Sequence, residues 1–335
     1  MNPAVGIVIL NWNRLDLTKN CLASLAEQSY QDYMVIVIDN GSSDGSVEWL
    51  EIQDLKLIKN PKNLGFARAI NQGISEALND GCKYVVSLNN DTKPAKTWLN
   101  ELVDYMDNHP LVGFAQGASM QADDKDKFDS TGIYLERGFI PNQRASGSDD
   151  PKLDIVPIGP NAAGAIYRSS MLTEARIKPG EYFDQRFFAY VEDVDFDLRC
   201  SLRGFKFAYV PEAKMYHVGS ATGNKVAHKK MYWGARNMVW LVFKNAPLYV
   251  LRRTFKMIIK SHLANLQFLW REQRSNFLPY LRGIAVGLLL CPLFIPKRWA
   301  NLRAQKLDSQ EFLAILTPSN PPLHNPLRRL ANLLK

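Results

Sequence analysis

The chain has 335 residues, of which 46% are hydrophobic and 22% carry charge. It is therefore long and apolar enough to bury a large core, which excludes a disordered protein. Its four cysteines lie far apart without a C-x-x-C pair, so neither a zinc knuckle nor a disulfide framework is expected. This cysteine usage is typical of the reducing cytosol, and we expect no secretory signal before the apolar residues Val5–Leu10.

Charge is distributed unevenly along the chain, whose formal net charge is +8. Residues 1–224 contain 22 Lys and Arg against 30 Asp and Glu, whereas residues 225–335 contain 19 against 3 and are rich in aromatic and aliphatic side chains. Such a basic, apolar region predicts contact with anionic lipid headgroups. Nucleic acid would attract the same charge, but the chain has no recognisable nucleic-acid-binding module, so we expect no such partner.

Short β-rich runs alternate with helical patterns in the first half, which is typical of parallel strands joined by crossover helices. Strands are predicted at Val5–Leu10, Met34–Ile38, Leu55–Lys59, Tyr84–Leu88 and Leu111–Gln116. Apolar residues at helical spacing predict helices across Leu17–Leu25 and Phe66–Leu78. Residues Gln121–Asp154 are polar and irregular and predict loops around a short hairpin. The whole pattern predicts a doubly wound α/β fold.

Three polar residues stand at the ends of predicted strands, where an open parallel sheet binds its ligands. They are Asn11, Asp39 and Asp91. Because the carboxyl ends of parallel strands meet at one edge of the sheet, we expect the three side chains to line one cleft. Each also has a structural interpretation, since Asp and Asn at strand ends often accept hydrogen bonds from turn amides.

A second group of acids follows among hydrophobic neighbours, with Glu192 and Asp193 at its start, and a lone histidine, His217, comes later. Acids at this spacing bind a ligand or flank the start of a helix. An isolated histidine is more often structural than a metal ligand. The residue types alone leave both interpretations open.

Taken in chain order, these segments resemble the family 2 inverting glycosyltransferases of GT-A fold, in particular rhamnosyltransferase-like members that build bacterial polysaccharides. The matching segments are Val8–Asn13, Val35–Asp44, Asn63–Asn71, Leu88–Asp91, Phe188–Arg199 and Val210–His217. The resemblance implies a GT-A catalytic domain over residues 1–224, with a Rossmann-like, mostly parallel sheet flanked by helices. It also implies that the first half of this domain binds the nucleotide-sugar donor and the second half the acceptor.

The resemblance further implies a divalent cation, which stabilises the negative charge that develops on the departing diphosphate. Asp91 is then the first metal ligand and His217 the second, with Mn²⁺ or Mg²⁺ as the ion. Asn89 and Asn90 precede Asp91 in place of a further acid. Water and diphosphate oxygens are therefore expected to complete the coordination sphere.

Inversion requires a carboxylate that takes the proton of the attacking acceptor hydroxyl. The resemblance implies Asp193 as this general base and Glu192 as the neighbour that orients the acceptor or the base. Asp195 and Asp197 are expected only to cap or decorate the helix that follows.

On the donor side, the resemblance implies that Asp39 accepts a hydrogen bond from the ring N–H that uracil and thymine share. Cytosine would leave this buried carboxylate unpaired, which is costly. The other donor-binding residues that the resemblance implies are Asn11, Gly65, Asn71, Asn90, Asp91 and Gly164. Gly65 also suits a helix start, and Gly164 also suits close packing.

The basic region 225–335 is predicted to be a helical, membrane-associating extension. Its longest apolar window, Gly283–Pro296, has about 14 residues and contains Pro292, short of the roughly 20 that a spanning helix needs. We therefore expect it to lie on the membrane, where Trp270 and Trp299 with flanking Lys and Arg suit an interfacial helix. Ordinary helices that pack on the catalytic region are the alternative.

The sequence thus predicts a cytoplasmic, metal-dependent, inverting glycosyltransferase that is peripherally bound to the inner face of the cell membrane. The first expected donor is dTDP-L-rhamnose, with a UDP-sugar as the alternative, and the acceptor is a lipid-linked glycan or a polysaccharide. A nucleotidyltransferase is disfavoured because no glycine-rich triphosphate loop follows the first strand. A non-catalytic, membrane-associated glycan-binding protein is the other alternative; it would be expected to lack a central acid, and Asp39, Asp91 and Asp193 are all present.

Overall fold

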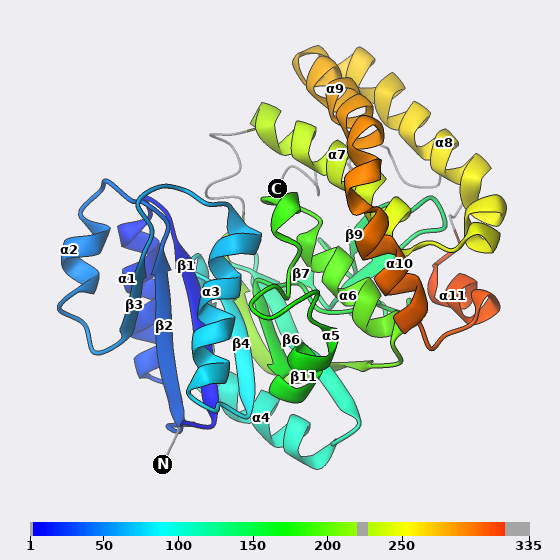
Figure 1. Cartoon of the computed structure of the whole chain (residues 1–335). Coiled ribbons are helices and arrows are strands. Elements are labelled where there is room, and N and C mark those ends of the chain that lie inside the picture. Colours follow the sequence, from blue (N-terminus) through cyan, green and yellow to red (C-terminus); the bar gives the residue numbers. More distant parts are fainter. Residues whose placement is uncertain (1–2, 220–226, 319–335) are drawn as a thin grey trace.

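The computed structural model describes residues 3–219 and 227–318 and is built around one large mixed sheet flanked by helices (Figure 1). In the described part of the chain this sheet has the order β3-β2-β1-β4-β10-β6-β11-β5, with β7 paired to β6. Its strands are β1 (Val5–Asn11), β2 (Tyr33–Asp39), β3 (Lys56–Lys59), β4 (Tyr84–Asn89), β5 (Thr92–Pro94), β6 (Val112–Gln121), β7 (Phe128–Ser130), β10 (Gly164–Arg168) and β11 (Lys206–His217).

The helices alternate with these strands in the first half and dominate the last third. They are α1 (Leu15–Ala26), α2 (Ser46–Leu50), α3 (Phe66–Asn79), α4 (Trp98–Asn108), α5 (Ser169–Ala175), α6 (Glu192–Leu202), α7 (Ala227–Asn245), α8 (Leu248–Glu272), α9 (Arg274–Leu290), α10 (Ile295–Ala304) and α11 (Ser309–Ile315). Two 3₁₀ turns, Gln185–Phe187 and Cys291–Phe294, precede α6 and α10. The predicted Rossmann-like α/β sheet flanked by helices is confirmed.

The first four strands of the sheet are parallel, and alternate side chains of β1 enter different cores. Ile7 and Ile9 pack with Leu25 of α1 on one face, whereas Val8 packs with Ile70 of α3 on the other. Because both faces of these strands are covered, their sequences are almost continuously apolar, which made them visible to sequence analysis.

The second half of the sheet departs from simple parallel order. β10 runs antiparallel to both β4 and β6, and β11 then pairs parallel to β6. β6 continues to Gln121, beyond the predicted end at Gln116. The predicted hairpin in the irregular segment is present as β8 (Ile133–Leu135) and β9 (Pro141–Gln143).

The C-terminal helices share a hydrophobic core with the preceding region. Leu241 of α7 and Val250 of α8 are fully buried and belong to the same cluster as Phe187, Val194 and Leu198 around α6. Helices α8 and α9 run side by side beyond the sheet (Figure 1). The predicted boundary at 224/225 lies outside the described residues, and the core is continuous on both sides of it.

The apolar segment near the C-terminus is longer than predicted. α9, the 3₁₀ turn and α10 follow one another without interruption over Arg274–Ala304, and this is the one segment of the described residues long and apolar enough to cross a membrane. The prediction that Gly283–Pro296 is too short to span was therefore wrong about length. Pro292 lies in the first turn of the 3₁₀ helix, where proline is tolerated because no backbone hydrogen bond is lost. The proline therefore does not end the helical segment.

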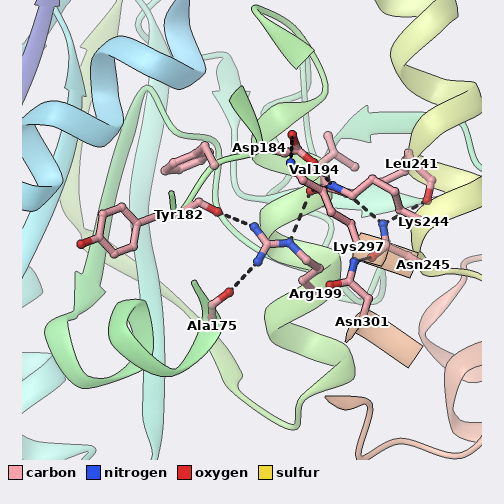
Figure 2. Close-up of polar contacts among 12 residues, drawn as sticks. Ala175, Tyr182, Asp184, Val194, Arg199, Leu241, Lys244, Asn245, Lys297 and Asn301 are labelled. Atoms are coloured by element: carbon pink, nitrogen blue, oxygen red, sulfur yellow. Dashed lines mark hydrogen bonds and ion pairs between the residues drawn. The ribbon is translucent and has the colours of Figure 1, made fainter. Parts of the chain in front are cut away.

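A buried network of charges joins α6 to α7 and α10 (Figure 2). The ammonium group of Lys244 on α7 is fully buried and lies 2.6 Å from Asp184 and 2.7 Å from Asp195. Lys297 of α10 is 2.7 Å from the other oxygen of Asp184. Burial opposes ionisation of Asp184, but the two ammonium groups outweigh it and lower the pKa of this carboxyl below its usual value.

Two further residues complete the network around Asp195. Asn245 donates a hydrogen bond of 2.9 Å to its second oxygen, and Arg199 lies 3.4 Å from its first. Arg199 also donates to the carbonyl groups of Ala175 and Tyr182. Asp195 was expected to cap or decorate its helix; this was wrong, since it is fully buried and paired with residues distant in sequence.

We predict that Lys244→Met lowers the free energy of unfolding by about 3–5 kcal/mol, because Asp184 and Asp195 would lose their shared cation inside the core. Chemical denaturation measures this change. Lys59→Met is the matched control, since Lys59 and Glu51 form a solvent-exposed pair whose loss has little effect on stability. A loss at Lys244 no larger than that of the control would contradict the prediction.

Candidate active site

The ends of β1 and β2 hold a compact set of polar side chains. Asn11 and Asp39 occupy paired positions of the two strands, and the Asn11 amide donates a 2.8 Å hydrogen bond to Asp39. The other oxygen of Asp39 accepts from the backbone amides of Gly41 and Ser42 at 3.1 and 2.9 Å. Asp39 therefore has three donors before any ligand binds, which differs from the expectation that a mismatched base would leave it unpaired.

The same cluster extends to the loop after β4. Asn90 donates to Asn11 at 3.2 Å and to Thr18 of α1 at 2.9 Å, and Thr18 donates to Asn11 at 2.9 Å. Asn11 is thus the centre of a network that joins three strand ends. Asn90, directly before Asp91, thus meets Asn11 and Asp39 at one edge of the sheet; that Asp91 itself lines one cleft with them stays a prediction.

Asp91 lies beside the end of β11, where His217 stands between two carboxylates. The Nε2 atom of His217 is 3.1 Å from Asp91, and its Nδ1 atom is 2.9 Å from Asp129. Burial lowers the pKa of His217, but its hydrogen bonds to Asp129 and Asp91 outweigh this and raise the pKa to about 10. Burial likewise raises the pKa of Asp91, but His217 outweighs it and lowers that pKa. The imidazole is thus protonated in this state.

The donor atoms at this point suit a divalent cation only in part. No group of three or more His, Cys, Asp or Glu side chains within residues 3–219 and 227–318 is arranged to hold an ion. Asp91 and His217 offer one oxygen and one nitrogen on the same side of the sheet edge, a donor pair that Mn²⁺ accepts. Binding through His217 requires its neutral form, so an ion would displace the proton shared with Asp91.

The acid pair Glu192–Asp193 forms the first turn of α6. Asp193 keeps partial exposure and accepts a 2.8 Å hydrogen bond from the amide of Val194. Burial raises its pKa, opposed by backbone hydrogen bonds that include the amide of Ala162. Glu192 is buried, and one of its oxygens has no hydrogen-bond partner in the described part of the chain. Burial together with the charge of Asp193 raises its pKa far above the usual value.

Asp197 lies one turn further along α6 and is fully buried. Neither of its carboxylate oxygens has a hydrogen-bond partner among residues 3–219 and 227–318, and burial together with the charge of Asp193 raises its pKa well above the usual range. A Cβ on Gly159 would lie 2.3 Å from the carboxyl carbon of Asp197, so the backbone at Gly159 packs closely against this side chain. The expectation that Asp197 caps or decorates the helix surface was therefore wrong.

The segments of Asp91 and Asp193 meet at residues 161–164. Asn89 donates through its backbone amide to Ala163 at 2.9 Å, and Ser87 donates to Ala162 at 2.8 Å. The backbone amide of Ala162 in turn donates a hydrogen bond to the Asp193 carboxylate, which lowers the pKa of that group. Gly164 begins β10 with its α-carbon against the buried Met215, where a Cβ would lie 2.3 Å from sulfur. Close packing is thus the contact that Gly164 makes in the structure.

The loop before α6 has a strained backbone. Phe188 has φ 68° and ψ −65°, and the amide of Ala189 donates to the carbonyl of Phe187, which is the rarer form of γ-turn. Tyr190 and Val191 both have φ 69°. Such conformations cost of the order of 1–3 kcal/mol each and persist only where the surroundings hold them.

Two residues from distant segments hold this loop. The amide nitrogen of Asn237 on α7 lies 3.0, 3.0 and 2.7 Å from the carbonyl oxygens of Phe187, Ala189 and Tyr190. Gly65, with φ 84°, begins α3 against Phe188, and a Cβ there would lie 2.6 Å from the aromatic ring. Gly65 therefore allows the acid-bearing loop to approach the first half of the sheet.

Asn71, predicted to bind the donor, is fully engaged elsewhere. Its amide donates to the carbonyl of Phe183 at 2.8 Å and its oxygen accepts from the amides of Tyr182 and Phe183. Its role toward a donor stays a prediction.

Sequence analysis did not single out Asp129, Thr18 or Asn237. Asp129 lies in an irregular polar segment, and Asn237 lies in a region interpreted as facing lipid, so no local signal marked them.

Residues 6–164 match the sequence model of Glycosyl transferase family 2. The chain therefore contains a family 2 glycosyltransferase domain. An N-acetylglucosaminyl-diphospho-decaprenol L-rhamnosyltransferase of Mycobacterium tuberculosis is 26% identical over 82% of this chain and 97% of its own length. The dTDP-rhamnosyl transferase RfbF of Shigella flexneri is 25% identical over 73% of this chain and 82% of its own length.

Two further relatives are matched over half of their length or less. The chain covers 35% of an uncharacterized glycosyltransferase of Haemophilus influenzae, at 27% identity, and 50% of glucomannan 4-beta-mannosyltransferase 7 of Arabidopsis thaliana, at 22%.

Among solved structures, S. aureus TarS residues 1–349 has a TM-score of 0.57 at 15% identity, covering 90% of this chain and 88% of that one. The mannosyltransferase PcManGT of Pyrobaculum calidifontis has a TM-score of 0.51 at 19% identity, covering 94% and 86%. The predicted GT-A fold is confirmed.

We predict that Asn237→Asp loosens the strained loop, because aspartate cannot donate to the three carbonyl groups and its charge repels them. Amide hydrogen exchange across residues 187–195 should become roughly tenfold faster or more, while the sheet is unchanged. Exchange read by mass spectrometry measures it. Asn108→Asp is the matched control, since Asn108 is exposed on α4. Unchanged exchange in this loop would refute the role of Asn237.

Proposed function

We propose that the protein is an inverting glycosyltransferase that transfers a sugar from a nucleoside diphosphate donor, with Asp193 as general base. The observation that carries this proposal is the acid pair at the start of α6, which the Ala162–Gly164 segment joins to the strand-end cluster of Asn11, Asp39 and Asn90. A partly exposed carboxyl with a raised pKa is a better proton acceptor than an ordinary aspartate. Glu192 lies beside it and orients the base or the acceptor.

The metal ion in this proposal is held by Asp91 and His217, with donor phosphates and water in the other positions. Bound there, it supplies Lewis-acid stabilisation of the departing diphosphate. Asp129 accepts a hydrogen bond from the second nitrogen of His217 and so fixes the orientation of the ring toward Asp91. PcManGT was solved with GDP-Man and Mn²⁺, which supports a metal-assisted reaction.

The donor we propose first is dTDP-L-rhamnose, with a UDP-sugar as the alternative. Two relatives with rhamnosyltransferase names and long coverage support this choice. Asp39 and Asn11 would approach the nucleobase, with Asn90, Asp91, Gly65, Asn71 and Gly164 along the rest of the donor. The acceptor is a lipid-linked glycan or a polysaccharide.

We place the enzyme on the cytoplasmic face of the membrane, bound through the outer surfaces of α8 to α10. Exposed apolar residues there include Phe255, Leu263, Leu288 and Leu289, the last 75% exposed. Exposed apolar side chains that gather on one surface mark a site of membrane or protein contact. The inner face of α9 packs on α7, where Gly283 touches the backbone of Tyr232, so only its outer face is free to enter lipid. This geometry favours lying on the membrane over crossing it.

We predict that Asp193→Asn lowers sugar transfer by about 10²–10⁴-fold, because asparagine cannot accept the acceptor proton. Release of nucleoside diphosphate from a panel of nucleotide sugars measures transfer. Binding of dTDP or UDP, measured by calorimetry, should change less than about twofold, since donor contacts remain. Asp150→Asn, on an exposed loop, is the control. Normal turnover by Asp193→Asn would eliminate the assigned base.

We predict that Mn²⁺ or Mg²⁺ together with dTDP or UDP raises the melting temperature more than either alone, because ligand binding stabilises the folded state. Asp91→Asn and His217→Ala should lose most of this metal-dependent increment. GDP serves as the comparison nucleotide, and Asp104→Asn on the exposed side of α4 as the control variant. Equal stabilisation with and without a chelator would argue against the metal site.

A further inference from the structure

Helices α7 and α9 border an open groove of about 750 Å³. None of the residues of the strand-end cluster lines it. Tyr232 and Trp233 line it from α7, and Leu278 and Leu281 line it from α9. Lys229 and Arg282 stand at its rim. The groove therefore combines an apolar lining with cationic edges.

The inner end of the groove adjoins the acid-bearing loop. The ring of Trp233 lies 4.8 Å from the ring of Phe188 and 6.3 Å from that of Tyr190, with centroid distances typical of packed aromatic pairs. Glu192 and Asp193 follow directly in sequence. A molecule in the groove that reaches Trp233 would thus meet the loop that leads into the proposed base.

The cations around the groove have no anionic partner in the part of the chain that the structure describes. No carboxylate there lies within ion-pair distance of Lys229 or Arg282, the two cations that line the groove. Lys229 and Arg282 are both exposed, so an anionic group of a ligand in the groove can pair with them directly.

The outer end of the groove leads onto exposed apolar surface. Leu278 is 69% exposed and Leu281 is 43% exposed, and the same helix continues with Leu288. These positions recur at helical spacing and form one stripe along α9. An apolar chain that leaves the groove would therefore meet the surface that we place against lipid.

We propose that this groove binds the lipid and phosphate portions of the acceptor, which is an amphiphile whose sugar is joined to an apolar chain through a phosphate or diphosphate. The sugar would lie at Trp233, the phosphate groups at Lys229 and Arg282, and the chain along Leu278. This inference rests on the proposed function, because the sugar end of the ligand is an acceptor only if the protein transfers a sugar. A glycan without a lipid would leave the apolar lining uncovered.

The test uses the full chain in mild detergent and farnesyl diphosphate as the probe, with inorganic pyrophosphate as the head alone and farnesol as the chain alone. We expect farnesyl diphosphate to bind at least about tenfold more tightly than either part, because both ends contribute. Lys229→Gln combined with Arg282→Gln should weaken this binding about tenfold or more. Arg252→Gln with Arg253→Gln, two exposed cations of α8, is the matched control.

A second variant tests the apolar lining without changing charge. Ala285→Trp introduces a large side chain at an exposed lining position and should exclude farnesyl diphosphate while the melting temperature stays normal. Wild-type affinity in both this variant and the double rim variant would overturn the proposal. Binding of farnesyl diphosphate no tighter than that of farnesol would overturn it as well.

Vesicles of phosphatidylglycerol separate a ligand site from a general membrane contact. We expect the rim variant to keep its vesicle binding while it loses farnesyl diphosphate; a parallel loss of both would overturn the assignment. Binding of dTDP in the same variant distinguishes this proposal from the proposed function. Loss of the groove ligand with dTDP retained supports the groove, whereas failure of dTDP to bind the wild-type protein counts against the donor site alone.

Discussion

The buried ammonium group of Lys244 sets the position of the C-terminal helices on the glycosyltransferase domain. It contacts Asp184 and Asp195 at once, and both carboxylates are fully buried. Because an unpaired charge in the core is strongly unfavourable, α7 cannot move away without disrupting the first turns of α6. Asn237 lies two helical turns before Lys244 and therefore on the same face of α7. One face of this helix thus holds both the acid helix and the strained loop that precedes it.

Phe188 is the point where three parts of the molecule meet. Gly65 from the first half of the chain packs against its ring, Trp233 from the groove also contacts that ring, and Glu192 follows it in the chain. Asn237 holds three carbonyl groups of the loop, and the missing side chain of Gly65 leaves room for Phe188, so the unusual backbone depends on both segments. The proposed donor side, the acid pair and the proposed acceptor groove are therefore linked through a single residue, although they come from distant parts of the sequence.

Sequence analysis predicted the elements whose signal is local. The buried strands of the first half are visible as apolar runs, and Asn11, Asp39 and Asp91 stand out because polar residues rarely end such runs without a reason. The partners of Asp195 were not predictable, because Lys244 comes 49 residues later in a region whose composition indicates lipid contact. Asp129 was missed for a similar reason: its meeting with His217 depends on how β7 and β11 both pair with β6.

The charge of the C-terminal region also has a different meaning in three dimensions. Part of it is structural, since Lys244 is buried and Lys297 pairs with Asp184. Another part, including Arg252 and Lys256, is exposed on α8 beside Phe255 and suits an anionic lipid surface. A third part, Lys229 and Arg282, lines the groove. Net charge alone predicts an attraction to anions, and only the fold separates the cations that hold the protein together from those that stay exposed.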